Sequence, residues 1–567
     1  MKTLKKYVPK VIKRSIKKAI GWRHPQYPDW RKIINEDQKR WQTALDSAKG
    51  GAKVLIATSI GGIAHLNVVD SSLAAALTLR GTEVHVLLCD SFLPACLKPE
   101  YPAIKNMPDF AAGGPLKSGL CSDCIDAAET MYQDMGITVH KYSEIVNTEK
   151  QRIADELSSG LTTDDLVSYE SNGVSVGEHA LAGALRFFAR GDLANEEYGE
   201  QVLRRYFKAA LLTVFACEAL FESHDFQSVV LHHGIYVPQG LIVGAARRAS
   251  VRVVTWWTAY RNKCFMFAHG DSYHHALLEE PVSNWENVKW TSDLETQVMD
   301  YMISRERGDR DWVRYNVHPE EEISKIEKEI GIDFSKPTIG LLSNVVWDAQ
   351  LHFQARAFPD MMSWVFATID YFADRPDLQL LIRAHPGEVV KFHKSRQPLV
   401  DEIRKRYPKL PDNIYIIPPE SLISTYTTMQ QCNAVLIYGT KAAMEMSSRG
   451  IPIIVAGEAW IRGKGFTMDA SSEEEYISIL NRLPLNGRMS KMEMYRARMY
   501  AYHFFFRRMI PLNFMVKIEN PPSFNLGISN ISEIKPGKSI GLDVICRGIL
   551  DAHEFIYPAE SGLEPIE

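Results

Sequence analysis

Short apolar runs alternate with helix-length amphipathic segments along most of this chain, and this alternation constrains its fold more than any other feature. Apolar runs of about 4–8 residues are typical of buried strands, and the segments between them are long enough for crossover helices. Repeated strand–helix alternation predicts an α/β fold built on parallel sheets.

The alternation occurs in two series, separated by a charged segment at 320–337 that reads as a helix followed by a linker. The first series predicts strands at 53–59, 82–89, 137–142, 228–234 and 251–257. The second predicts strands at 337–344, 378–385, 413–418, 434–439 and 451–457. We therefore expect two Rossmann-like domains that face each other across a cleft lined by the carboxyl ends of strands.

The length of 567 residues also requires more than one hydrophobic core. We expect a leader at 1–49, a first Rossmann-like domain at 50–330 with a helical insertion, and a second at 331–490. A helical segment at 491–567 is expected to pack back across the domains.

The first 23 residues, MKTLKKYVPKVIKRSIKKAIGWR, hold nine Lys or Arg and no acid. Apolar residues recur between them at helical spacing, which predicts a basic amphipathic helix. Such a helix suits an anionic membrane surface, and we prefer this interpretation to a nucleic-acid tail or a solvated leader. No apolar stretch reaches the roughly 18 residues of a spanning helix, so we expect a cytoplasmic protein held peripherally at the inner face of the membrane.

The stretch AVLIYGTKAAMEMSSRGIPIIV begins at residue 434 and carries the strongest binding motif. A strand delivers Gly439 and Thr440 to the start of a helix, where free amides and a hydroxyl suit a phosphate. Glu445 lies a little more than one turn further on and could accept two sugar hydroxyls. The alternative is a capped helix with an ordinary acid.

Three further stretches follow predicted strand ends of the same domain. GEAWIRGKGFT (457–467) adds Arg462 and Lys464 between glycines that allow close approach of backbone to a ligand. LLIRAHPGE (380–388) and LLSNVVWDAQ (341–350) add a set of polar strand-end residues, namely Arg383, His385, Pro386, Ser343 and Asn344. Because several such ends meet at one sheet edge, we predict a nucleotide-phosphate site there, although Asn344 could equally act as a structural cap.

The chain resembles the bacterial capsule polysaccharide biosynthesis glycosyltransferases in the order and spacing of three stretches, namely SNVVWDAQ, RAHPGE and the segment from Ser424 to Thr467. The resemblance covers about 335–470 well and the first half loosely. It implies a GT-B architecture in which the second domain holds the nucleotide sugar and the first holds the acceptor. It also extends to bacterial sialyltransferases and Kdo transferases, which bind a CMP-sugar through His-Pro and Ser/Thr motifs.

On that pattern, His385 and Pro386 would lie at the nucleotide phosphate, Thr440 at the Ser/Thr position, and Glu445 near the ribose. Gly439 stands where a serine of a Ser-Ser or Ser-Thr pair is expected, so the nucleotide, CMP or UDP among others, stays open.

The first domain offers several candidates for the base that activates an acceptor hydroxyl. Gly61 and Gly62 would keep the acceptor-side loop open, and His65 follows near the next helix start. The rivals are Glu178, beside His179, and the pair His232 and His233. The sequence alone does not choose among them.

Aromatic residues follow the strand at 251–257, and Cys121 and Cys124 form a Cys-x-x-Cys pair. Trp256, Trp257 and Tyr260 suit core packing better than stacking on a ligand. No second pair of ligands stands at zinc spacing near the cysteines, so we expect two small buried residues rather than a metal site.

These features predict a metal-independent glycosyltransferase of surface polysaccharide or glycolipid assembly. His385, Arg383, Lys464 and the helix terminus would stabilise the departing nucleotide in place of a metal ion. It would need no cofactor beyond the nucleotide-sugar co-substrate, and no nucleic acid is expected as a partner. No Asp-x-Asp motif stands at a predicted strand end. The alternatives are a nucleotide-sugar 2-epimerase-like isomerase, a polyol-phosphate transferase and a non-catalytic scaffold of capsule assembly.

Overall fold

The computed structural model describes residues 24–121, 124–307, 310–312, 318–348, 354–390, 394–518 and 524–562. The predicted basic helix at 1–23 lies outside these residues. Within them, no helix is long and apolar enough to cross a membrane.

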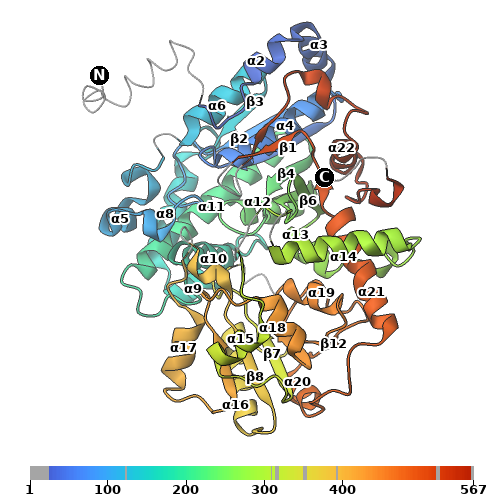
Figure 1. Cartoon of the computed structure of the whole chain (residues 1–567). Coiled ribbons are helices and arrows are strands. Elements are labelled where there is room, and N and C mark those ends of the chain that lie inside the picture. The colour runs from blue at the N-terminus through green and yellow to red at the C-terminus, as the bar shows by residue number, and fades with distance from the viewer. Residues whose placement is uncertain are drawn as a thin grey trace, which may run out of the picture.

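Two sheets organise the described chain (Figure 1), and together they confirm the predicted α/β fold with two Rossmann-like domains. The first sheet has the order β13-β6-β5-β4-β1-β2-β3, and the second has the order β12-β11-β10-β7-β8-β9. All pairs of the second sheet are parallel. In the first sheet, the pairs β5–β6 and β6–β13 are antiparallel and the others are parallel.

The strands of the first sheet are β1 (Lys53–Ser59), β2 (Glu83–Leu88), β3 (Thr138–Lys141), β4 (Phe226–His232), β5 (Arg252–Thr258), β6 (Cys264–His269) and β13 (Ile510–Pro511). Those of the second are β7 (Thr338–Leu342), β8 (Gln379–Arg383), β9 (Ile414–Ile417), β10 (Ala434–Ile437), β11 (Ile453–Val455) and β12 (Met468–Asp469). A separate hairpin joins β14 (Met515–Lys517) to β15 (Phe524–Leu526). All ten predicted strands are present, with ends that shift by a few residues.

The longer helices of the first half are α3 (Gln38–Ala48), α4 (Ala64–Thr78), α5 (Met107–Lys117), α6 (Cys124–Met135), α8 (Thr148–Gly160), α10 (Val176–Phe188), α11 (Gly199–Ser223), α12 (Gln239–Arg248) and α14 (Ser292–Arg307). In the second half they are α15 (Ile323–Ile330), α16 (Met361–Ala373), α17 (Leu399–Arg406), α20 (Glu473–Leu480), α21 (Lys491–Tyr502) and α22 (Ile540–Asp551). Shorter helices that enter the argument are α13 (Tyr273–Leu278), α18 (Thr425–Gln431) and α19 (Ala442–Ser447).

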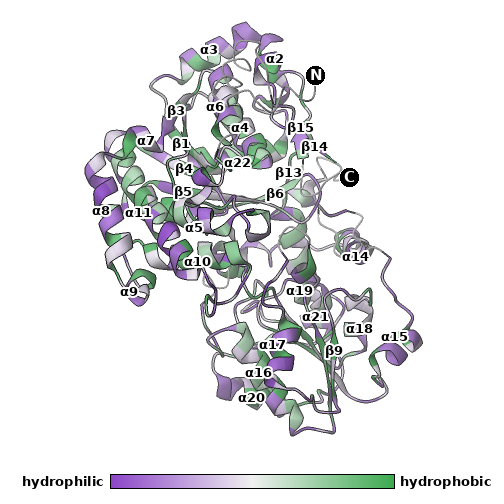
Figure 2. Cartoon of the chain, turned by 90° about the vertical axis from the view of Figure 1, so that its left-hand side faces the viewer, coloured by the Kyte–Doolittle hydropathy of each residue, from purple (hydrophilic) through white to green (hydrophobic). Residues whose placement is uncertain are grey.

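Helices cover both faces of each sheet, which explains why the strands are apolar throughout. In β1, Val54 and Ile56 pack into the core that contains α4, whereas Leu55 and Ala57 pack into the core that contains α11. Both faces of a central parallel strand are buried, so every position favours an apolar residue. Figure 2 shows hydrophobic residues along the strands and hydrophilic residues on outward helices such as α8.

The C-terminal segment returns from the second domain to the first (Figure 1). Helix α21 contacts α19 of the second domain, and β13 then adds an edge strand to the first sheet through Ile510 and Phe265. Helix α22 packs against α4. The last described part of the chain therefore ties the two domains together.

A buried carboxyl group lies between α4 and the first sheet. Asp70 has no exposed surface and accepts hydrogen bonds from Thr58 Oγ1 and Trp256 Nε1, both at 2.8 Å. Burial raises the pKa of Asp70 to about 7, against the opposing effect of these two bonds. The folded protein therefore holds a proton here that the unfolded chain releases near pH 4.

We predict that Asp70→Asn weakens the pH dependence of stability between pH 4 and 7. Because the pKa of Asp70 is higher in the folded state, this residue lowers the free energy of unfolding as pH rises, by about 1.4 kcal/mol per pH unit. Asparagine cannot ionise; its Oδ1 can accept from Trp256 Nε1, and its Nδ2 can donate to Thr58 Oγ1. Urea denaturation at several pH values should show that the free energy of unfolding of Asp70→Asn declines less steeply with rising pH than that of wild type. The exposed control Asp412→Asn should decline as wild type does. An identical pH profile for wild type and Asp70→Asn would contradict the prediction.

Candidate active site

Parallel pairing brings three polar turns of the second domain to one edge of its sheet. Strands β10, β7 and β8 are neighbours, so their carboxyl ends lie side by side. The amide of His385, after β8, donates to Ser343 Oγ, after β7, at 3.0 Å. A Cβ atom at Gly439 would lie 2.6 Å from the carbonyl oxygen of Glu458 and 4.0 Å from Asn344 Nδ2. Gly439 therefore permits a contact between turns that no other residue allows.

His385 is held as a neutral donor at this edge. Its Nδ1 accepts the amide of Gly387 at 3.0 Å, and Pro386 begins the single turn of 3-10 helix that follows, Pro386–Val389. Burial lowers the pKa of His385 to about 4, with smaller contributions from Arg383 and Lys441. Since Nδ1 accepts a hydrogen bond, the proton of the neutral ring lies on Nε2. The ring can thus donate from Nε2 to an anionic ligand.

The turn after β10 carries a lysine that the sequence analysis missed. Thr440 is 9% exposed, and the next residue, Lys441, places Nζ 2.6 Å from Glu445 Oε1 and 4.4 Å from the ring centre of Tyr260. Tyr260 follows β5 of the first domain, so Lys441 lies where the two domains meet. The sequence signal that could have identified Lys441 is its position directly after Gly439 and Thr440.

Glu445 is the centre of a buried group of charges. Its carboxylate accepts from Arg305 Nε at 2.9 Å as well as from Lys441, and the hydroxyl of Tyr426 donates to its other oxygen. Arg305 also pairs with Asp311. Burial opposes ionisation of Glu445, but Arg305 and Lys441 outweigh it and lower its pKa to about 2. The two positive charges of Arg305 and Lys441 thus balance the two negative charges of Glu445 and Asp311.

The remaining predicted donor-site cations are bonded within the protein. Arg383 donates to Thr425 Oγ1 at 3.1 Å and to the carbonyls of Pro418 and Ser421. Arg462 donates to Ser471 Oγ at 2.9 Å. Lys464 donates to the carbonyls of Leu278 and Glu280, both at 2.9 Å.

The structure therefore brings together Ser343, Asn344, His385, Pro386, Gly439 and Thr440, and turns Arg383, Glu445, Arg462 and Lys464 toward protein partners. A nucleotide contact by any of the last four stays a prediction, and it would require these internal bonds to exchange. The physical reason is burial: each charged group taken from water needs a partner, and nearby backbone carbonyls or side chains supply one.

In the first domain, the turn after β1 packs closely against other parts of the chain. A Cβ at Gly61 would lie 2.5 Å from the carbonyl of Cys124, and one at Gly62 would lie 2.3 Å from Lys98 Nζ. His65, in the first turn of α4, is close enough to affect the pKa of His232. Burial lowers the pKa of His65 to about 4, which makes it a weak base.

Glu178 and His233 have different surroundings. Burial raises the pKa of Glu178, opposed by nearby His275. His233 directly follows β4 with a φ of +68°, a conformation that is uncommon for a non-glycine residue and is found often at functional sites. Its amide donates to the carbonyl of Trp256 at 2.9 Å, which fixes the turn.

A row of rings leads from His233 to the second domain. The ring of His233 lies 4.5 Å from that of Trp257 and 6.3 Å from that of His274. His274 stacks on Trp460 at 5.5 Å, and Trp460 Nε1 donates to the carbonyl of His274 at 3.2 Å. The sequence analysis quoted Trp460 without assigning it a role and did not select His274.

A hydrogen bond also joins the two domains, from the hydroxyl of Tyr236 to Asp348 Oδ1 at 2.9 Å. Since Tyr236 follows β4 and Asp348 follows β7, the carboxyl ends of both sheets face the same interdomain region. The row of rings, Tyr260 and Lys441 lie in this region.

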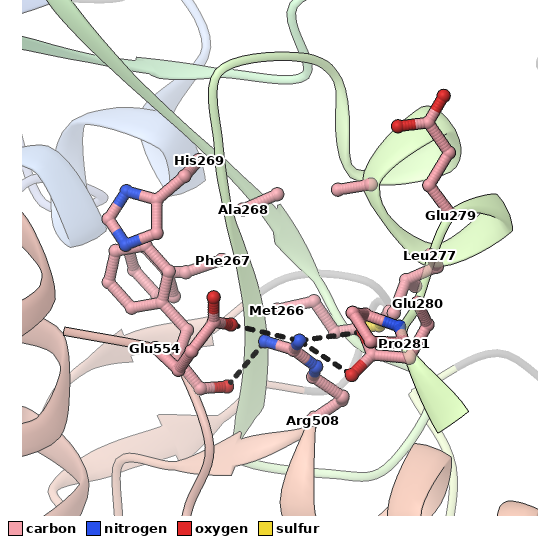
Figure 3. Close-up of a pocket in the computed structure, with 12 residues that line it drawn as sticks. Met266, Phe267, Ala268, His269, Leu277, Glu279, Glu280, Pro281, Arg508 and Glu554 are labelled. Atoms are coloured by element: carbon pink, nitrogen blue, oxygen red, sulfur yellow. Dashed lines mark hydrogen bonds and ion pairs between the residues drawn. The ribbon is translucent and has the colours of Figure 1, made fainter. Parts of the chain in front are cut away.

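A cavity of about 210 Å³ lies elsewhere, beside β6 and α13 (Figure 3). Arg508 Nη2 pairs there with Glu280 at 2.6 Å and with Glu554 at 3.0 Å. His503 Nε2 lies 2.9 Å from the same Glu280. Because none of the predicted site residues lines the cavity, we do not assign it to the candidate active site.

The Cys-x-x-Cys pair is buried and reduced. Cys121 and Cys124 are free thiols, and burial raises the pKa of both. Thiols of this kind are unreactive at neutral pH.

No family model and no curated protein matches this chain. Among solved structures, it is similar to KpsC, a beta Kdo 2,4 transferase of Thermosulfurimonas dismutans, at 12% identity over 48% of this chain and 79% of that one, with a TM-score of 0.32. The alpha,alpha-trehalose 6-phosphate synthase of Burkholderia multivorans matches at 12% identity over 80% and 95%, with a TM-score of 0.31. A UDP-GlcNAc 2-epimerase of Neisseria meningitidis matches at 9% identity over 80% and 94%, with a TM-score of 0.23. Likeness at this level carries no argument about activity.

We predict that Arg305→Leu strongly destabilises the protein, because it leaves Glu445 and Asp311 buried without their shared partner. Breaking a buried ion pair costs about 3–5 kcal/mol in the free energy of unfolding. Urea denaturation monitored by tryptophan fluorescence would measure the loss. Arg406→Leu is the matched control, since its pair with Asp370 is exposed, and its midpoint should stay at the wild-type value. Equal midpoints for Arg305→Leu and wild type would show that the buried group contributes nothing to stability.

Proposed function

We propose that this protein is a glycosyltransferase that uses a nucleotide sugar, with the donor bound at the shared edge of β7, β8 and β10. The observation that carries the proposal is the meeting of Ser343, Asn344, His385 and Thr440 at one edge, beside Lys441. A neutral imidazole N–H, a hydroxyl, an amide and an ammonium group are donors that a diphosphate or monophosphate ester requires.

The chemistry follows from these groups. The acceptor hydroxyl attacks the anomeric carbon as its proton passes to a base, and the bond from that carbon to the nucleotide phosphate oxygen breaks. Negative charge then develops on the departing phosphate. His385 Nε2–H and Lys441 are the donors that would stabilise this charge, in a region from which closure of the domains would exclude water.

For the base, we propose His233 among the predicted candidates. It stands at the carboxyl end of β4 in an uncommon backbone conformation, and its ring begins the row that reaches Trp460 of the second domain. Desolvation lowers the pKa of His65 to about 4, and Glu178 lies near His275 rather than in the row.

We infer the class of acceptor from the basic segment at residues 1–23. Nine basic residues and no acid in the first 23 suit an anionic membrane surface, which is where polysaccharide and glycolipid acceptors are assembled. We therefore propose a peripheral enzyme of the cell envelope that acts at the inner face of the membrane.

We predict that one of CMP, CDP, UDP and GDP raises the melting temperature of the full-length protein. His385→Ala should weaken that nucleotide roughly 10- to 100-fold, because it removes a donor to a charged group, and Thr440→Val roughly 2- to 10-fold. Thermal shift over a nucleotide titration measures both. Thr427→Val, an isosteric change on α18 of the same domain, is the control and should leave affinity unchanged. A wild type that responds to none of the four nucleotides, or an unaltered response in His385→Ala, would overturn the donor site.

We further predict that His233→Asn lowers the rate of sugar transfer about 10²- to 10⁴-fold, the range for loss of a general base. The affinity for the nucleotide should stay at the wild-type value, because His233 belongs to the other domain. Transfer from the nucleotide sugar selected by thermal shift to envelope polysaccharide fragments would give the rate. Unchanged turnover in His233→Asn would assign the base elsewhere.

A further inference from the structure

Three histidines from separate parts of the chain meet on the first sheet, away from the candidate active site. His85 lies in β2, His140 in the edge strand β3, and His224 directly after α11. One ring nitrogen of each lies within 4.8 Å of those of the other two. His85 Nδ1 is 2.8 Å from His140 Nε2, and the ring of His224 lies 5.4 Å and 4.9 Å from those of His85 and His140.

Neighbouring groups orient two of these rings. Glu83 Oε1 lies 3.1 Å from His85 Nε2, and its other oxygen accepts the amide of Gly50 at 2.9 Å. Ser223 Oγ lies 2.9 Å from His224 Nδ1. A carboxylate that holds the far N–H of an imidazole is the usual support of a metal-bound histidine, because it fixes the tautomer and turns the other nitrogen toward the ion.

From this arrangement, we propose that His85 Nδ1, His140 Nε2 and His224 Nε2 bind one divalent transition-metal ion of the Zn²⁺ class. Three imidazole nitrogens suit Zn²⁺ and its neighbours rather than Mg²⁺ or Ca²⁺, which prefer oxygen ligands. The side chains of His140 and His224 are partly exposed, so water can supply the fourth ligand.

Little movement of His85 and His140 relative to each other is needed to admit the ion. With Zn–N bonds of about 2.0–2.1 Å, tetrahedral coordination places ligand nitrogens about 3.3 Å apart. His85 Nδ1 and His140 Nε2 would therefore separate by about half an ångström from their present 2.8 Å. If Glu83 holds the proton of His85 on Nε2, His140 now donates from Nε2 to His85 Nδ1. On binding, His140 moves its proton to Nδ1, so both lone pairs face the ion and no net proton is released.

The place of the cluster indicates a structural role. His85 and Phe226 pack together near the amino-terminal ends of β2 and β4, whereas the candidate active site lies at the carboxyl ends. An ion here would join the exposed edge strand β3 and the end of α11 to the centre of the sheet. The ion would thereby restrain a strand that has a neighbour on one side only.

The test uses the full chain without an affinity tag, stripped with EDTA and dialysed. Titration with Co²⁺ should give the visible absorption of a four-coordinate ion, saturating at one ion per chain, and Zn²⁺ should abolish it. Zn²⁺ should also raise the melting temperature, and EDTA should reverse the rise. His140→Ala and His224→Ala should both lose the band, and Glu83→Gln should bind Co²⁺ about 10- to 100-fold more weakly.

His553→Ala, which removes an exposed histidine elsewhere, is the matched control and should bind as wild type does. Circular dichroism would check that each variant is folded. Absence of a stoichiometric Co²⁺ band in wild type would overturn the proposal. So would equal binding by wild type and both folded alanine variants. The rise in melting temperature caused by a nucleotide should be the same in His140→Ala and wild type. A failure of the metal-site proposal can therefore be distinguished from a failure of the proposed function.

Discussion

Parallel pairing of β10, β7 and β8 is the constraint on which the candidate active site depends. Parallel strands all end at the same edge, so turns that are far apart in sequence become neighbours. The hydrogen bond from the amide of His385 to Ser343 Oγ spans two such turns. Gly439 lets the turn after β10 approach the carbonyl of Glu458, after β11, without a side chain in the way. If this register slipped by one residue, the turns would lose these contacts together.

Buried charge determines which of the polar residues can face a ligand. Glu445 is fully enclosed and is neutralised by Arg305 and Lys441, whereas Lys441 also reaches Tyr260 of the first domain. The carboxylate therefore positions the lysine, and through it the turn after β10. Arg383 and Lys464 instead bind loop carbonyls, which ties β8 to the 418–425 loop and the 457–467 loop to the end of α13.

The histidines of this chain serve different purposes because their surroundings differ. His385 is kept neutral by burial, and its Nδ1 bond to Gly387 leaves the ring proton on Nε2. His233 and His274 belong to a row of rings between the domains. His85, His140 and His224 gather around one another instead, with Glu83 behind them. Residue type alone does not separate these three situations.

The sequence by itself determined the two series of buried strands, the α/β class and the strand ends that carry Ser343, Asn344, His385 and Thr440. Apolar periodicity and turn residues are local properties, so they can be read without knowing what packs against them. Only the tertiary structure decided that Glu445 pairs with Arg305 and Lys441 and that Arg383 bonds to loop carbonyls. It also decided that Lys441, His274 and Trp460 lie between the domains, and that three distant histidines meet on one sheet. Those outcomes depend on which segments become neighbours in space, and a pattern along the chain carries no record of that.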